Sequence, residues 1–414
     1  MEPGYETSLF SDPKERVYFD FWLQLVANIY LFPNDIMHRV VPQLARQEPA
    51  IKHAALAMAG MARALVPSLV HRSEKELHNN GPHYEFALQQ YGRAIKLVRS
   101  SQPSSENMLW AIVCCVLFVT FECLHGDRTA ALSHMNHAYR MMETYFSQRS
   151  LLEDGRVTES IRTVCPIYTE IYVDGLSEDM LVGGYVRPAL SPTHSEKLVA
   201  VLPEFLKHLR KWSTAFQGIY DELRSHQHLE KADYHLYVDA CNLRLQYLTL
   251  WNEVSSLSYT DIRVVIILTP SFREIVQLSR TILRAQSNCG GCSDTFSMDN
   301  GPTWPLLVTA CRCRDANLRQ EATELLGKYH RRDGLWDSRI FHGVAKRNMG
   351  IEMENVMTGD EYEQWSRMSR RELRFSRNGE VTGRLFKWDP SRSQWLHVEE
   401  PLATTSDAKL SREL

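Results

Sequence analysis

Two pairs of cysteines are the residues of this chain whose spacing most resembles a metal site. Two glycines separate Cys289 from Cys292, and Cys311 and Cys313 follow after a gap in the zinc-ribbon range. Zinc needs four ligands arranged around one point. Side chains two positions apart on a helix diverge by about 200°, so Cys311 and Cys313 are poor partners for one ion. The pattern favours a loop pair plus buried thiols, with a four-cysteine zinc site as the alternative.

A second candidate is the pair His134 and His137, three positions apart, with His125 near them in the sequence. Histidines at this spacing share one helical face and can bind the same metal ion. No carboxylate stands at a matching spacing, so a structural role is the favoured interpretation. The sequence therefore predicts no metal and no cofactor.

A basic stretch near the C-terminus is the third candidate. Aromatic residues interleave with its arginines, which is typical of contact with nucleic acid or with an acidic protein. The favoured alternative is a solvated face that Glu372 and Glu380 partly neutralise. If the stretch does bind an acidic partner, the expected contact residues are Arg370, Arg371, Arg374 and Arg377.

Composition and motifs exclude several classes of protein. The chain has no phosphate-binding loop, no dinucleotide fingerprint, no nucleophile elbow and no His-Glu-x-x-His motif. We therefore expect no catalytic residue and no enzyme activity. A formal charge of -3 gives no overall attraction to nucleic acid or to acidic membranes. The polar N-terminus is unlike a signal peptide, and the adjacent Cys114 and Cys115 fit a reducing compartment.

Helical periodicity runs through most of the chain. The segment Met108–Phe121 is apolar on nearly every side, which predicts a helix in the middle of a bundle, and it is shorter than the roughly 20 residues that span a bilayer. Amphipathic helices are expected before it, from Gly81, and after it, through Leu132 and Phe146. Further helices are expected at Glu15–Tyr30, Asn34–Arg46, Glu48–Leu65, Thr158–Tyr172, Thr269–Gln286, Leu306–Arg312, Asn317–Tyr329 and Gly334–Asn355.

Two stripes of apolar residues have the steps of three and four that mark a heptad seam. We expect them to form an antiparallel helix pair within one chain, and an intermolecular coiled coil is the alternative. The first stripe is Leu202, Phe205, Leu209, Trp212, Phe216, Ile219 and Leu223, and the second is Leu236, Ala240, Leu243, Tyr247, Leu250, Val254 and Leu257.

The C-terminal part has the pattern of strands. Asn378-Gly379 is a strong turn signal between Arg374–Arg377 and Val381–Trp388, and Gln394–Val398 is a candidate third strand. The predicted fold is mainly α: a multi-helix bundle of antiparallel helices with a small C-terminal β-hairpin. The predicted divisions are a flexible tail at 1–13, a helical regulatory domain at 14–365, a basic helix end and hairpin at 366–400, and a disordered tail at 401–414.

Several segments together carry a resemblance to a known family. They are Gly81–Met142, EPAIKHAALAMAGMARAL (Glu48–Leu65), PLLVTACRCRD (Pro305–Asp315) and RRDGLWDS (Arg331–Ser338). In order and spacing they resemble the regulatory helical domain of fungal-specific transcription factors, which normally follows a six-cysteine binuclear zinc cluster. The resemblance covers roughly Glu15–Asn348. Its signature residues, for which we expect structural roles, are Cys313, Arg314, Asp315, Arg331, Arg332, Trp336 and Asp337.

The resemblance implies a fungal transcription regulator, nuclear rather than cytoplasmic, and a secondary-metabolite gene set is its expected target. The six-cysteine cluster is missing, because the first cysteine is Cys114. Direct sequence-specific DNA binding is therefore not expected of this chain alone, and neither is membrane binding. A protein partner is expected, either a related DNA-binding regulator or a second copy. The alternatives are a helical adaptor without a role in transcription and a small-molecule-binding helical protein.

Overall fold

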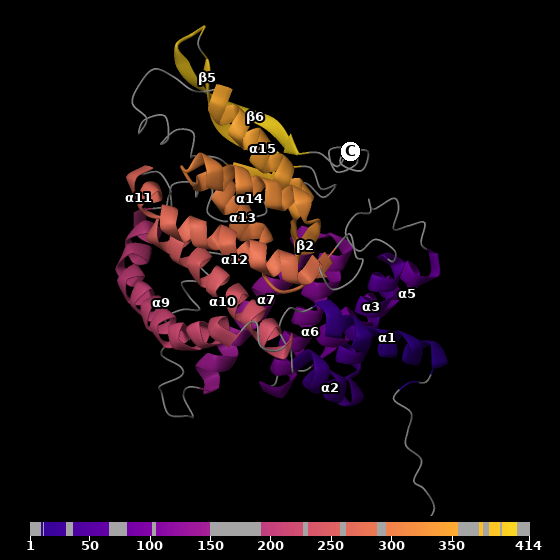
Figure 1. Cartoon of the computed structure of the whole chain (residues 1–414). Coiled ribbons are helices and arrows are strands. Elements are labelled where there is room, and N and C mark those ends of the chain that lie inside the picture. Colours follow the sequence, from indigo (N-terminus) through magenta and orange to yellow (C-terminus); the bar gives the residue numbers. More distant parts are fainter. Residues whose placement is uncertain are drawn as a thin grey trace, which may run out of the picture. The chain divides into compact units, whose positions relative to one another are not determined.

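The computed structural model of the chain describes residue 10 and residues 12–29, 36–65, 81–101, 105–149, 192–226, 231–256, 262–287, 295–354, 372–375, 381–389 and 391–403. Most of these residues are helical, which confirms the mainly α fold (Figure 1). Contacts divide the chain into two compact units. Unit 1 is Met1–Cys165 with Phe296–Asp299, and unit 2 is Pro166–Thr295 with Asn300–Leu414. The predicted divisions after residues 13, 365 and 400 stay predictions.

Unit 1 contains the helices drawn in indigo to purple in Figure 1. The expectation of one helix over Asn34–Arg46 is wrong, because a short π-helix comes first and an α-helix follows it. Pro42 stands in the first turn of that α-helix, where a missing N–H costs least. The elements are α1 (Pro13–Ile29), η1 (Ile36–Val40), α2 (Val41–Gln47), α3 (Pro49–Leu65), α5 (Gly81–Ser100), α6 (Ser105–His125) and α7 (Arg128–Arg149).

Helix α3 packs closely on α5 because its facing residues are small. A Cβ added to Gly60 would lie only 3.0 Å from the Cα of Ala87, so glycine is needed for this approach. Helix α6 is the apolar helix that was expected in the middle of a bundle, and it contacts α3, α5 and α7. Its stretch Asn107–His125 is long and apolar enough to cross a membrane by length and composition, but 56% of it is buried. Its contacts are those of a core helix.

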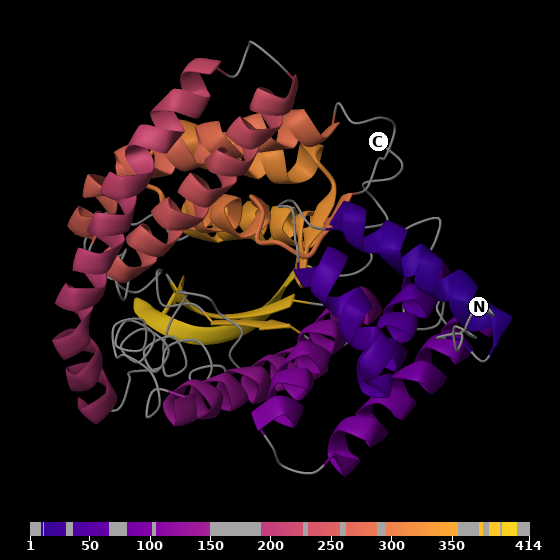
Figure 2. The same cartoon turned by 90° about the horizontal axis from the view of Figure 1, so that it is seen from below.

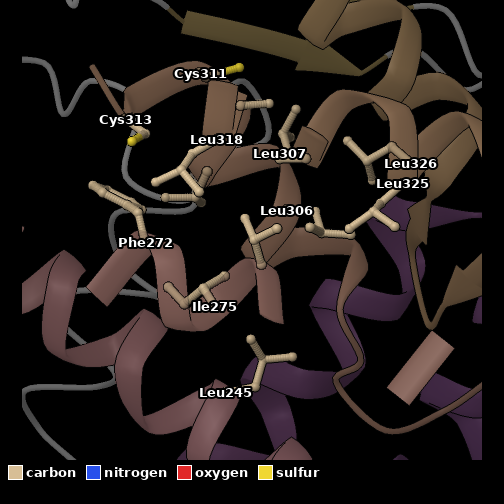
Figure 3. Close-up of a cluster of buried hydrophobic side chains, with 14 of the residues drawn as sticks. Leu245, Phe272, Ile275, Leu306, Leu307, Cys311, Cys313, Leu318, Leu325 and Leu326 are labelled. Carbon is tan, nitrogen blue, oxygen red and sulfur yellow. The ribbon is translucent and has the colours of Figure 1, made fainter. Parts of the chain in front are cut away.

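Unit 2 has its own core, formed by helices α10, α12, α13, α14 and α15 (Figure 3). Leu245 of α10 and Phe272 and Ile275 of α12 meet Leu306 and Leu307 of α13 there. The helices of unit 2 are α9 (Pro192–His226), α10 (Lys231–Ser255), α11 (Ile262–Ile267), α12 (Thr269–Ser287), α13 (Thr303–Arg312), α14 (Ala316–Lys328) and α15 (Ser338–Glu354).

Helices α9 and α10 form the expected antiparallel pair. The rings of Trp212 and Tyr247 lie 5.4 Å apart and those of Tyr220 and Tyr237 lie 6.1 Å apart, so contacts run in opposite order along the two helices. The heptad seam therefore lies within one chain.

The predicted apolar stripe of α10 is only partly right. Leu236 is 52% exposed and Leu243 is 42% exposed. The buried face instead contains Tyr237, Cys241, Leu245 and Leu248. Helix α10 packs against α12 and α13 as well as α9. Its buried face is consequently turned by about 100°, one residue, from the heptad stripe.

The expectation that a helix begins at Gly334 is also wrong. Strands β2 (Arg331–Asp333) and β3 (Trp336–Asp337) pair antiparallel there, and α15 begins only at Ser338. Gly334 has a φ of 56°, and a glycine with positive φ is what two-residue hairpin turns favour. Thr295, at the start of β1 (Thr295–Ser297), donates its N–H to the carbonyl of His330 at 3.2 Å.

The C-terminal hairpin is confirmed as part of a three-stranded antiparallel sheet (Figure 2). Its strands are β4 (Glu372–Phe375), β5 (Val381–Asp389) and β6 (Gln394–Ala403), in the order β4-β5-β6. Strand β6 continues past Val398, where the third strand was expected to end. The Asn378-Gly379 turn lies outside the described residues, as does the helix expected at Thr158–Tyr172.

Candidate functional site

Three aspartates of the predicted signature region each lie at the start of a helix. Asp315 accepts from the N–H groups of Asn317 and Leu318, at 3.0 and 3.1 Å, and so caps α14. Asp337 accepts from the N–H of Arg339 at 2.9 Å, in the first turn of α15. Carboxylates are favoured at helix N-termini, where backbone N–H groups lack helical partners. These aspartates therefore set where two of the core helices begin.

The third aspartate, Asp333, reaches a helix 30 residues away. Its Oδ2 accepts from the N–H of Thr303, the first residue of α13, at 3.0 Å. Its Oδ1 accepts from the guanidinium of Arg331, with a distance of 2.8 Å from Nε. Both side chains are buried, each 2% exposed. A Cβ on Gly301 would lie 2.5 Å from Oδ2, so the ion pair fills the space above that glycine.

A second charged cluster joins the ends of α13, α14 and α15. Glu352 of α15 is buried and accepts from Arg314 at 3.1 Å and from Arg319 at 2.7 Å. Arg319 also donates to the carbonyl of Ala310 at 2.9 Å. Cys313, between α13 and α14, is fully buried, and burial raises the pKa of its thiol. The cluster satisfies buried charges within the chain.

Trp336 lies half-buried in an aromatic group. Its ring lies 4.9 Å from that of Trp304 and 5.6 Å from that of Phe341. The indole N–H of Trp304 donates to Glu253 at 2.9 Å. Neighbouring Arg332 donates from Nε to the carbonyl of Gly334 at 3.0 Å, across the hairpin turn. All seven signature residues thus lie among intrachain contacts.

The other sequence candidates are placed only in part. Arg374 lies in β4, and Arg370, Arg371 and Arg377 lie outside the described residues, as do Cys289 and Cys292. Cys311 and Cys313 are both buried in the unit 2 core (Figure 3). Within the described ranges, no group of three or more His, Cys, Asp or Glu side chains is arranged to hold a metal ion.

The most extensive polar network that we find is in unit 1 and was missed in the sequence. Glu122 of α6 is only 4% exposed, and three helices bring polar groups to it. The hydroxyl of Tyr91, on α5, donates to its Oε1 at 2.5 Å, and Nδ1 of His125 lies 3.2 Å from its Oε2. The same tyrosine oxygen lies 2.7 Å from Nε2 of His134, on α7. Tyr84 of α5 extends the network on the His125 side, with its hydroxyl 3.2 Å from Nε2 of His125.

Hydrogen-bond chemistry fixes the proton positions in this network. The single proton of the Tyr91 hydroxyl goes to Glu122, so His134 must donate its Nε2–H to the tyrosine oxygen. A carboxylate only accepts, so His125 donates from Nδ1. One buried carboxylate thereby orders four aromatic side chains.

Helix α5 extends the same arrangement along its length. His83, one residue before Tyr84, has its Nδ1 2.7 Å from the hydroxyl of Tyr18 on α1. Gln90, one residue before Tyr91, has its Oε1 2.6 Å from Nδ1 of His53 on α3. The bundle of unit 1 is therefore held by a row of tyrosine, histidine and amide contacts beside its apolar core.

Burial keeps Tyr91 and the thiols of unit 1 in their neutral forms. Burial raises the pKa of Tyr91 well above its usual range, and the hydrogen bond to Glu122 raises it further. Burial also raises the pKa of Cys115 to about 11 and that of Cys114 higher still. A thiol that is protonated at neutral pH is a poor nucleophile and a poor metal ligand. These groups are suited to structure rather than to covalent chemistry.

The signal that could have revealed this network is Glu122 itself. It is a charged residue inside an otherwise apolar segment, and a buried carboxylate needs partners. Glu122 does not stand at a helical spacing from His134. It is connected to that histidine through Tyr91, which lies on another helix. Contacts across three helices do not show as a spacing in the sequence.

Acidification is expected to lower the stability of unit 1. Burial lowers the pKa of His134 below its ordinary value of 6.5, and that of His53 likewise. Between the lowered folded pKa and the unfolded value the unfolded chain binds more protons, so stability rises with pH in that window. The melting temperature, followed by calorimetry between about pH 5 and pH 7.5, should fall toward the acid end.

His134→Phe should flatten this pH dependence, because it removes one of the groups that must protonate on unfolding. His38→Phe, at an exposed position of η1 in the same unit, is the matched control and should leave the slope unchanged. An identical slope in wild type and His134→Phe would contradict the assignment.

Comparison with known proteins identifies unit 1. Residues 16–187 match the family model described as the fungal specific transcription factor domain. That range contains α1 to α7 and the whole network around Glu122, whereas the signature segments near Asp315 and Trp336 lie outside it. A search of curated proteins found no match, and a search of solved structures found none. Residues 16–187 of this chain are thus similar to the fungal specific transcription factor domain.

Proposed function

We propose that the chain is a fungal transcription regulator that acts through protein contacts made by its helical units. The observation that carries this proposal is the family match over residues 16–187. That family is not enzymatic, and the site agrees with it. The buried tyrosines, histidines and thiols are paired or neutral, and they bind helices together.

The finer part of the proposal concerns targets and location. We propose a nuclear protein that controls a limited gene set, with a secondary-metabolite set as the candidate. Its partner would be a related DNA-binding regulator, because these 414 residues contain no six-cysteine segment of their own. The partner would provide the surface that reads DNA.

The isolated chain is expected to show no sequence-specific DNA binding at physiological salt. Neutralisation of phosphates supplies most nonspecific affinity for DNA, and the formal net charge of this chain is -3. Any binding should therefore be weak and should fall steeply as salt increases. Selection from a random oligonucleotide library tests this, and nanomolar, sequence-selective binding would contradict it.

The partner and the location are tested together by recovering the tagged chain from fractionated fungal cells. The proposal predicts recovery from nuclei in a complex with a DNA-binding protein. The Asp333→Ala variant, which is expected to be less stable, serves as a comparison and should give less of the complex. A chain found exclusively in the cytosol would favour a helical adaptor instead.

A further inference from the structure

Helix α9 has an outward face that the fold of unit 2 does not use. The 35-residue helix turns Phe216, Tyr220 and Leu223 toward the core of the unit, whereas Trp212 and Ile219 of its predicted apolar stripe are exposed. The opposite face is exposed and consists of residues at steps of three and four, which place them on one side. They are Lys207, Lys211, Thr214, Gly218, Glu222 and Ser225.

Gly218 lies in the middle of this face and has no packing reason to be glycine. A Cβ added there would meet nothing within 4 Å, whereas at Gly60 and Gly301 it would press on neighbouring atoms. Glycine in a helix interior costs about 0.5–1 kcal/mol relative to alanine. Among the described residues the space beside Gly218 is open, as it is beside Gly92 of α5, so a partner helix can approach closely there.

The same face is hollowed and charged. A surface hollow of about 450 Å³ lies against Lys207, Arg210, Lys211, Thr214 and Ala215. Lys207, Arg210 and Lys211 make its lining cationic, and Glu204 pairs with Lys207 at 3.1 Å. Thr214 and Ala215 are its small side chains. One turn past Gly218 the exposed Asp221 and Glu222 add negative charge, with the exposed Arg224 two residues after Glu222.

Apolar side chains flank this face where α9 meets α10. Ile219 and Trp212 of α9 are 56% and 40% exposed, and Leu243 and Leu236 of α10 are 42% and 52% exposed. The antiparallel order of the two helices brings these four side chains to one seam. The face thus combines exposed apolar area with opposite charges at its two ends.

We propose that a second copy of the chain packs on this face, with the two α9 helices antiparallel about a two-fold axis between residues 216 and 217. That axis sets Lys211 opposite Glu222 of the second copy, and Ala215 opposite Gly218 of the second copy. Each contact occurs twice, as a two-fold interface requires. The small residues lie at the crossing and the hollow receives the partner's acidic turn. Such self-association is independent of any role in transcription.

Charge complementarity selects a second copy over another partner. An acidic helix from an unrelated protein would match the cationic rim around Lys211, but it would set its own carboxylates against Asp221 and Glu222. A second copy in antiparallel orientation satisfies both ends at once. The attraction is between exposed charges, so it should weaken when salt shortens the Debye length.

Sedimentation of the full-length chain tests the proposal. Wild type should be dimeric at micromolar concentration in about 50 mM salt and should dissociate toward 500 mM. Lys211→Glu and Glu222→Lys should each weaken the dimer at least about 10-fold through like-charge contact. The double variant K211E/E222K should restore it, because the swapped charges meet again across the axis.

Two further variants separate association from folding. Lys346→Glu, at an exposed position of α15, is the matched control and should leave the dimer unchanged. Gly218→Leu should keep the helical circular dichroism signal and abolish the dimer by filling the crossing. A monomeric wild type at low salt would overturn the proposal. So would single variants that remain dimeric, or a double variant that remains monomeric while its helical signal is intact.

Discussion

Replacing Asp333 with alanine is expected to lower the free energy of unfolding by about 3–5 kcal/mol, the cost of leaving a buried charge without its partner. Arg331, at 2% exposure, would keep its charge and lose the carboxylate that faces it. The N–H of Thr303 at the start of α13 would lose its acceptor at the same time. Urea unfolding of wild type and variant measures the difference.

Two comparisons make that result specific. Glu324→Ala removes an exposed carboxylate from α14 of the same unit and should change stability by no more than about 0.5 kcal/mol. The double replacement Arg331→Met with Asp333→Leu should recover much of the loss, since well-packed apolar residues often substitute for a buried ion pair. If Asp333→Ala has the same free energy of unfolding as wild type, the contact between Asp333 and the first residue of α13 does not stabilise the fold.

Trp336→Ala is expected to cost about 3 kcal/mol, toward the lower end of the range for truncating a large aromatic residue, because the indole is half-buried. The loss comes from the contacts with Trp304 and Phe341, which hold the hairpin against α13 and α15. Thermal unfolding followed by circular dichroism measures it. Trp212→Ala, at a more exposed indole on α9, should cost clearly less. An unchanged melting temperature with lost regulatory activity would instead make Trp336 a contact residue.

Most helices could be predicted from the sequence because their apolar residues recur with helical periodicity. The apolar segment Met108–Phe121 became the centre of α6, and Thr269 is the first residue of α12 as expected. The C-terminal strands followed from a turn signal between alternating residues. Such patterns involve residues that are close together in the chain, so they can be recognised in a single sequence.

What the sequence pattern missed depends on contacts between distant residues. The hairpin at Arg331–Asp337 is too short to show alternation, and its Asp-Gly turn was read as the start of α15. The buried face of α10 differs from the predicted heptad stripe because α10 packs against α9, α12 and α13 rather than against one helix. For the candidate site, His134 and His125 were noted, but Tyr91 and Glu122 complete the network from α5 and α6. The helix-starting roles of Asp315, Asp333 and Asp337 likewise required the folded chain.

The central claim is that this chain regulates transcription, and transcript levels after deletion of its gene test it most directly. The account predicts altered levels for a limited gene set. Re-expression of the wild-type chain should restore those levels, and re-expression of the Asp333→Ala variant should restore them less well, because that variant is expected to be less stable by about 3–5 kcal/mol. A transcriptome that is unchanged by the deletion, under conditions in which the protein is present, would contradict the claim.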